Sequence, residues 1–281
     1  MRPAATVITT KNDNKLKALA IKKQKVHVLC AQPSKQQGTP VYFDVEGVPG
    51  EDFYYLIGMR YKIGDEWIES SLWANTREEE RAIWTQCIQR LSALKSPQII
   101  HYGHYETIFF KRMRERYPEA VPHPEYINEL LSRSHNLIAS IYGSIYFPTY
   151  TNGLKDIAGY LGFRWTESEG SGSLASLWRL YWELTFDDKM KAKLLRYNIE
   201  DCRAAEVVAT GVHQICNGVS RSSDSSMEFV DVNSLDVPYS RTFGKFSSAL
   251  PEFQRINDAA YWDYQRERGY FYERMITFDE Q

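Results

Sequence analysis

Three stretches of the sequence place acidic side chains among apolar or aromatic ones. These are Asp44 and Glu46 in VYFDVEG, Glu106 in HYGHYE, and Tyr197 with Asp201 in YNIED. Residues two apart in a strand point to the same face, and residues four apart in a helix share one face. The spacing therefore predicts two carboxylates side by side on a strand, and a tyrosine beside a carboxylate on a helix.

Such carboxylates suit a particular chemistry. Acids in apolar surroundings are costly unless they are paired or metal-bound, and acids brought together repel one another unless divalent cations lie between them. Mg²⁺ and Mn²⁺ prefer carboxylate oxygens, and two such ions about 3.5–4 Å apart stabilise both oxygens of an in-line phosphoryl displacement. We therefore predict a site for two Mg²⁺ or Mn²⁺ ions, with the ligands Asp44, Glu46, Glu106 and Asp201.

Each acid also has a simpler explanation. Glu106 could begin a helix, where an acid interacts favourably with the helix dipole. Tyr197 and Asp201 could form an ordinary exposed pair, although the small and apolar residues after Asp201 favour burial. Asp44 and Glu46 are the hardest to explain in this way, because a Val- and Phe-rich strand has no structural use for two carboxylates.

Other polar residues lie near these acids. His101 and His104 suggest zinc through their spacing, but Gly103 and the preceding strand argue against one helical turn. A hydrogen bond or a substrate contact is the better interpretation of both histidines. Lys155 in GLKDIAGYLG fits either a surface position or a contact with a phosphate.

The elements that would carry these residues can be predicted from periodicity. TPVYFDVEG, FYYLIGMRY and WIESSLWA predict three strands joined by short turns, hence an antiparallel meander. A helix follows, for which Thr76 and Glu79 predict a capping box, and then a fourth strand in SPQIIHYG. Later helices are expected in NGLKDIAGYLGF, in SLASLWRLYWEL, and in the long run from FDDKMKAK through YNIED, where Asp187 is available as N-cap.

Together these motifs resemble a known family. Asp-x-Glu on the first strand, an aromatic–acid pair after the fourth and Tyr-x-x-x-Asp on a late helix are similar to the DEDD 3′–5′ exonucleases with tyrosine in the third motif (DEDDy). YFDVEG, FYYLIG, HYGHYE, GLKDIAGYLGF and RYNIEDCRA resemble the ribonuclease-H-like (YprB-type) domain of predicted RecB-family nucleases. The resemblance runs from about Thr39 to Cys216, and AAYWDYQRER resembles sequence that follows that domain. It implies an α/β, ribonuclease-H-like fold with a mixed central sheet of about five strands, the first three antiparallel, flanked by helices.

The resemblance also implies a role for each catalytic residue. Asp44 would bridge two metal ions, while Glu46 and Asp201 would complete the first metal site. Glu106 holds the second-motif position, where most family members have aspartate. Tyr197 would orient the attacking water through its hydroxyl group.

The implied activity is hydrolysis of phosphodiester bonds from the 3′ ends of single-stranded DNA or RNA. Tyr105, His104 and Lys155 would contact this substrate. The alternative is a non-catalytic or regulatory nucleic-acid-binding module within a larger nuclease or mobile-element assembly. An integrase-like transferase on the same fold is disfavoured by the tyrosine of the third motif, and an unrelated α/β protein would hold Asp44 and Asp201 far apart.

Charge is distributed unevenly along the 281 residues. Residues 1–38 carry a net charge of +7, whereas the whole chain carries −2, which leaves −9 for the remainder. The basic residues of this segment are Arg2, Lys11, Lys15, Lys17, Lys22, Lys23, Lys25 and Lys35. We predict a basic N-terminal extension at 1–38, the DEDDy domain at 39–218, and a loop with a C-terminal extension at 219–281. A basic segment beside an acidic body suggests contact with a polyanion, although solubility alone could explain it.

The remaining composition bears on location. No stretch approaches the ~18–20 apolar residues that span a bilayer, and the N-terminus shows no apolar core of a secretory leader. The four cysteines, Cys30, Cys87, Cys202 and Cys216, form no CxxC pair. We predict a cytoplasmic protein whose partners are nucleic acid and other modules of a nuclease complex, with no membrane partner.

Overall fold

The computed structural model divides the chain into two compact units, residues 1–235 and 236–281. All the residues that the structure describes belong to the first unit, and they are 14–29, 38–48, 50–167, 172–218 and 229–232. Several predicted features lie outside these residues: part of the basic segment, Cys30, and nearly all of the predicted C-terminal extension.

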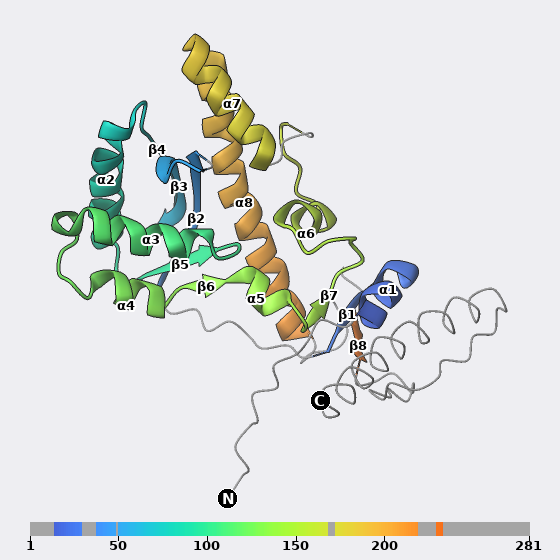
Figure 1. Ribbon diagram of the computed structural model, residues 1–281. Coiled ribbons are helices and arrows are strands. Elements are labelled where there is room, and N and C mark those ends of the chain that lie inside the picture. The colour runs from blue at the N-terminus through green and yellow to red at the C-terminus, as the bar shows by residue number, and fades with distance from the viewer. Residues whose placement is uncertain (1–13, 30–37, 49, 168–171, 219–228, 233–281) are drawn as a thin grey trace, which may run out of the picture. The chain divides into compact units, whose positions relative to one another are not determined.

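A mixed five-stranded sheet forms the centre of this unit (Figure 1). Its strand order is β4-β3-β2-β5-β6, with the first three strands antiparallel and with β5 and β6 parallel to β2. The strands are β2 (Thr39–Val48), β3 (Phe53–Ile63), β4 (Glu66–Trp73), β5 (Pro97–His101) and β6 (His135–Asn136). The predicted fold class, an α/β ribonuclease-H-like fold with a mixed sheet and an antiparallel meander, is confirmed.

The predicted helices are present in the predicted order, whereas two short helices, Tyr126–Ser132 and Leu137–Ile141, lie in a stretch for which no helix was predicted. Two short 3₁₀ helices, η1 (Arg77–Glu79) and η2 (Pro118–Ala120), accompany the α-helices. These are α2 (Glu80–Ser92), α3 (Tyr105–Arg116), α4 (Tyr126–Ser132), α5 (Leu137–Ile141), α6 (Leu154–Tyr160), α7 (Gly172–Thr185) and α8 (Asp188–Gly218). Among the helices of the described residues, none combines the length and the apolar character needed to cross a membrane.

Two predicted helix starts have different outcomes. Thr76 makes no side-chain capping hydrogen bond, so the predicted capping box is wrong. The η1 turn precedes α2, and Glu79 instead accepts hydrogen bonds from the backbone N–H (2.8 Å) and the side-chain amide (2.7 Å) of Asn75. Asp187 does cap α8, because its Oδ1 accepts the backbone N–H of Lys189 at 2.9 Å.

Side chains along β2 alternate between two apolar clusters. Phe43 is buried in a cluster with aromatic side chains of α2 and α3, whereas Tyr42 joins a second cluster that includes Val208 of α8. Side chains on a strand alternate between the two faces of the sheet, so Asp44 and Glu46 share the face of Tyr42. That is the face along which the long helix α8 runs (Figure 1).

A second, three-stranded sheet lies near the C-terminal end of α8. Its order is β7-β1-β8, built from β7 (Ile145–Tyr146), β1 (Val26–Val28) and β8 (Phe229–Asp231). Helix α1 (Asn14–Lys23) precedes β1, and its Lys17 donates hydrogen bonds to the Phe147 carbonyl (3.1 Å) and to Asn152 (2.8 Å). Residues 14–28 of the predicted N-terminal extension therefore contact the segment that contains β7.

Candidate metal centre

Three of the predicted acids converge where α8 passes β2. Asp44 and Glu46 come from β2 and Asp201 from α8, and each offers a carboxylate oxygen within 4.8 Å of the others. The strand supplies two of them because of its two-residue repeat, and the helix supplies the third from a position more than 150 residues later. Only oxygen ligands are present in this group, as hard divalent cations prefer.

The acids strongly perturb one another. Burial, followed by the charges of Asp201, Glu46 and Glu106, raises the pKa of Asp44 well above its usual value. Burial and the charges of Asp201 and Glu106 raise the pKa of Glu46 to about 8. Burial raises the pKa of Asp201 to about 7, although a hydrogen bond from Trp165 opposes the rise. Within the described residues, no lysine or arginine forms an ion pair with Asp44, Glu46 or Asp201.

Glu106 lies in the first turn of α3 and is 4% exposed. Its Oε2 is 3.5 Å from Nδ1 of the buried His101 but makes no hydrogen bond, and it lies outside the group of three converging acids. Its charge nevertheless raises the pKa of Asp44 and of Glu46, so it is near enough to act on them. A buried carboxylate oxygen that accepts no hydrogen bond, and whose charge acts on other acids, fits a site for divalent cations.

Tyr197 is buried beside Asp201, as the helical spacing predicts. Its hydroxyl group donates a hydrogen bond to the Asp201 carboxylate, and its ring meets Trp178 of α7 edge-on at 5.8 Å. Burial and the charge of Asp201 raise the pKa of Tyr197 above its usual value. The phenol therefore stays protonated and acts as a hydrogen-bond donor.

The three predicted substrate contacts differ in how far they are exposed to solvent. Lys155 on α6 has an enclosed Nζ without a hydrogen-bond partner, 4.7 Å from the centroid of the Tyr197 ring. Burial lowers the pKa of Lys155, while the charge of Asp201 opposes this effect. His104 and Tyr105 are exposed at the start of α3. The Tyr105 hydroxyl lies so close to Gly47 of β2 that a Cβ there would collide with it.

Sequence reasoning missed two residues that hold the acids. Nδ2 of Asn198 donates to Oδ2 of Asp44 at 2.6 Å, and Nε1 of Trp165 donates to Oδ1 of Asp201 at 2.7 Å. Asn198 had a signal, a polar amide next to Tyr197 on a helix face predicted to be buried. Trp165 had none, because it lies in an irregular segment after α6.

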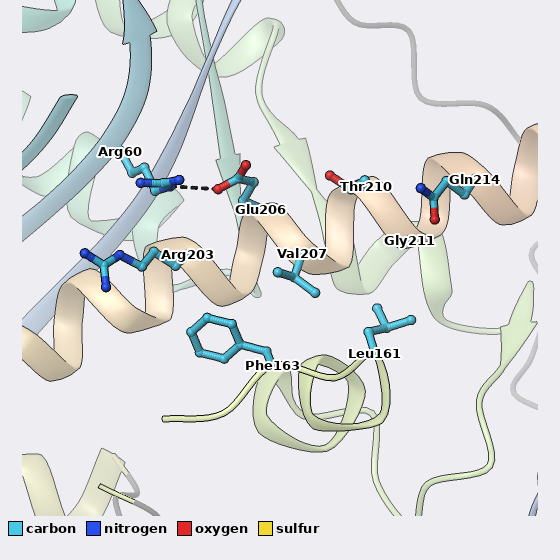
Figure 2. A pocket seen from close by; sticks show the side chains of 9 residues that line it. All are labelled: Arg60, Leu161, Phe163, Arg203, Glu206, Val207, Thr210, Gly211 and Gln214. Carbon is cyan, nitrogen blue, oxygen red and sulfur yellow. Dashed lines mark hydrogen bonds and ion pairs between the residues drawn. The ribbon is translucent and has the colours of Figure 1, made fainter. Parts of the chain in front are cut away.

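A separate cavity of about 450 Å³ lies on another side of α8. Leu161 and Phe163 point toward the helix there, and Arg60 forms an ion pair with Glu206 at 2.7 Å (Figure 2). Arg203, which also lines the cavity, is paired with another glutamate. The cavity contains none of the converging acids, and its arginines are already neutralised within the chain.

Comparison with known protein families matches residues 41–212 to the RNase H superfamily. The match spans more than half of the chain and includes all the acids described above, so the chain belongs to the RNase H superfamily. Domains of this class are typically metal-dependent nucleases that act on nucleic acid and generally use divalent ions. Neither the curated proteins nor the solved structures contain a match.

Proposed function

We propose that the chain is a metal-dependent 3′–5′ exonuclease that acts on single-stranded ends of DNA or RNA. The observation that carries the proposal is the convergence of Asp44, Glu46 and Asp201 within 4.8 Å, with no basic side chain paired to them among the described residues. The catalytic domain would extend over residues 39–218, with residues 1–38 and 219–281 as its extensions.

Two Mg²⁺ or Mn²⁺ ions, when bound, would stabilise the attacking and leaving oxygens of a phosphoryl displacement. Asp44, Glu46 and Asp201 would hold one ion, and Asp44 with Glu106 would hold the other. The raised pKa values of Glu46, about 8, and of Asp201, about 7, support this assignment. A cation among these carboxylates favours their charged form and removes the penalty that their mutual repulsion imposes.

Tyr197 and Lys155 would position the reactants. The Tyr197 hydroxyl, kept protonated and held at Asp201, can orient a water molecule but cannot serve as a base at neutral pH. The Lys155 ammonium group has no hydrogen-bond partner and lies beside the Tyr197 ring, so its charge would attract a phosphate oxygen of the substrate, although the enclosed Nζ would have to turn outward to contact it.

The start of α3 would hold the end of the strand. Tyr105 is 44% exposed and directly precedes Glu106, so its ring can stack on a base next to the cleaved bond. His104 is exposed beside it. The acidic body of the chain would repel a polyanion, and we assign the compensating attraction to the basic residues of segment 1–38.

The test uses the full chain with 5′-labelled and 3′-labelled single strands of DNA and of RNA. We expect the 5′-labelled strands to shorten progressively, the 3′ label to be released first as mononucleotide, and a chelator to stop both reactions. Asp44→Asn and Asp201→Asn should each reduce the rate by more than about 100-fold, because even the outer-shell partners of metal ligands contribute about 10- to 100-fold. Asp188→Asn, an exposed acid at the start of α8, is the matched control and should keep the wild-type rate.

One observation favours a second candidate function. Glu106 lies outside the group of converging acids, as would suit a nucleic-acid-binding module that has lost the second ion. Such a module would bind labelled strands in Mn²⁺ without shortening them, and the nuclease proposal would then be wrong.

A further inference from the structure

Asn198 of α8 occupies an enclosed position next to the metal centre. It is 0% exposed, and its Nδ2 donates to Oδ2 of Asp44 at 2.6 Å and to the Asp44 main-chain carbonyl at 3.3 Å. One amide group therefore fixes both the side chain and the backbone of the same acid. Its Oδ1 has no hydrogen-bond partner, so the side-chain amide forms hydrogen bonds only as a donor, through Nδ2.

Space for this amide comes from a glycine on the neighbouring strand. Gly58 of β3 is paired directly opposite Asp44 of β2. A Cβ atom at Gly58 would lie 2.8 Å from Cγ of Asn198 and closer still to its Oδ1. The backbone of Gly58 does not have the positive φ that would itself require glycine, and glycine weakens a strand interior. Close approach of Asn198 is the reason that remains.

The chemistry of the donor suits a cation site. A lysine or arginine beside Asp44 would neutralise it and compete with a metal ion. An amide restrains the carboxylate through one oxygen and leaves its negative charge in place. Oδ1 of Asp44 accepts no hydrogen bond from a described residue, so it is available as a ligand.

We infer that Asn198 is a positioning residue for the metal ligand Asp44, and that Gly58 is needed to admit it. This inference deepens the proposed function and rests on it. Outer-shell hydrogen bonds of this kind orient a ligand before the ion arrives. In this role Asn198 would act through Asp44 and not by contacting substrate or ion.

The test measures Mn²⁺ binding to the full chain by calorimetry, without substrate. Asn198→Leu keeps the approximate shape of the side chain and removes the donor, and Asn198→Ala empties the position. We expect each to weaken Mn²⁺ binding by about 10- to 100-fold. Asn217→Ala, an exposed amide on the same helix, should bind as the wild type does. The unfolding midpoint of each variant in chelator separates misfolding from loss of affinity.

A double-mutant cycle then tests the role of the glycine. Gly58→Ala should weaken Mn²⁺ binding in the wild-type chain but add nothing to Asn198→Ala, because the clashing side chain is then gone. Gly159→Ala, where an added Cβ would meet no atom within 4 Å, is the matched glycine control and should bind normally.

The outcomes distinguish this inference from the proposed function. If Asp44→Asn abolishes Mn²⁺ binding but both Asn198 variants bind within about twofold of wild type, the positioning role is wrong and the metal site survives. An equal cost of Gly58→Ala in both backgrounds would refute the role of Gly58. If the wild-type chain binds no Mn²⁺, the inference and the proposed function fail together.

Discussion

Two regions of the molecule hold carboxylates that are buried or half-buried, and they treat the charge of these groups in opposite ways. Glu80 of α2 is 0% exposed, and Oε1 accepts the backbone N–H of Tyr54 at 2.8 Å. Its Oε2 accepts the Tyr117 hydroxyl at 2.9 Å and forms an ion pair with Arg116. Every oxygen of this carboxylate has a partner, and its charge is balanced.

The metal centre has neutral donors in place of that arginine. An amide, an indole and a phenol hold Asp44 and Asp201, through Asn198, Trp165 and Tyr197 respectively. Neutral donors orient carboxylates but do not cancel their charge, so the pKa of Asp44 stays raised. The contrast teaches that this chain can neutralise a buried acid with its own arginine, whereas among the described residues Asp201 has only the unpaired charge of Lys155 nearby and the balancing charge at Asp44 and Glu46 is left for a cation to supply.

The largest effect is expected when the balanced region loses the arginine that pairs with Glu80. Arg116→Met leaves Glu80 buried with hydrogen bonds but without its counter-charge, and losing one partner of a buried pair costs about 3 kcal/mol. Urea denaturation should show this loss in the free energy of unfolding, while Mn²⁺ affinity stays unchanged. Arg112→Met, on the exposed side of the same helix, should cost clearly less. If both variants lose a similar free energy of unfolding, the burial of Glu80 does not make the loss of its arginine more costly.

Adding Mn²⁺ should balance the negative charge of the metal centre and so stabilise the folded chain. At a Mn²⁺ concentration of about 100 times its dissociation constant, binding to the folded state raises the free energy of unfolding by about 2.7 kcal/mol. Asp44→Asn should lose this stabilisation and Arg116→Met should keep it, as thermal unfolding with and without chelator will show. Stabilisation of Asp44→Asn equal to that of wild type would place the ion elsewhere.

The pH dependence of the metal-free chain gives a smaller effect of defined sign. The pKa of Asp201 is about 7 in the folded chain, above its ordinary value of 3.8. The folded state therefore holds this proton more tightly than the unfolded state, and the associated stability is present at low pH and lost as pH rises through 7.

The matched variant for this effect is Asp201→Asn, which carries no charge at any pH. Between about pH 5.5 and 8.5, in chelator, wild type should lose on the order of 2 kcal/mol more stability than the variant. Denaturation series at several pH values measure the difference. If the stability of the two chains changes with pH in the same way, the pKa of Asp201 is not raised in the folded state.

The smallest effect concerns the indole that holds Asp201. Trp165→Phe keeps an aromatic ring but removes the 2.7 Å hydrogen bond, which should weaken Mn²⁺ binding by about tenfold or less. In the wild-type chain, Mn²⁺ should also change the tryptophan emission, and Trp165→Phe should lose most of that change. Trp67→Phe, at a ring stacked on Arg60 of β3, is the control and should retain it.

Much of the fold could be predicted because its signals are local. Alternation in VYFDVEG and the short turns after it fix an antiparallel meander, and helical periodicity locates α2 and α8. The register of strand pairing is not local. That Gly58 lies opposite Asp44, and that Asn198 reaches both, depends on how α8 crosses the sheet. The sequence carries only partial traces of this contact, an isolated glycine in FYYLIGMRY and a polar amide, Asn198, next to Tyr197.

The candidate site, too, could be predicted only in part. The types and spacing of Asp44, Glu46 and Asp201 suggested ligands because such residues have no structural use in apolar segments. The donor Trp165 could not be found in that way, since a tryptophan is ordinary in any apolar surrounding. The predicted start of α2 is wrong for a related reason, because one extra 3₁₀ turn moves the partner of Glu79 from Thr76 to Asn75, whereas the predicted cap at Asp187 is confirmed.

The small sheet joins segments from opposite ends of the described chain. His27 of β1 is paired with Val230 of β8 in a parallel register, so the two strands are separated by most of the sequence. During synthesis on the ribosome, β1 emerges before β8 and cannot pair with it until the roughly 200 residues between the two strands have been translated. Closure of this sheet should therefore be a late and slow step of folding, since contacts so distant along the chain form last.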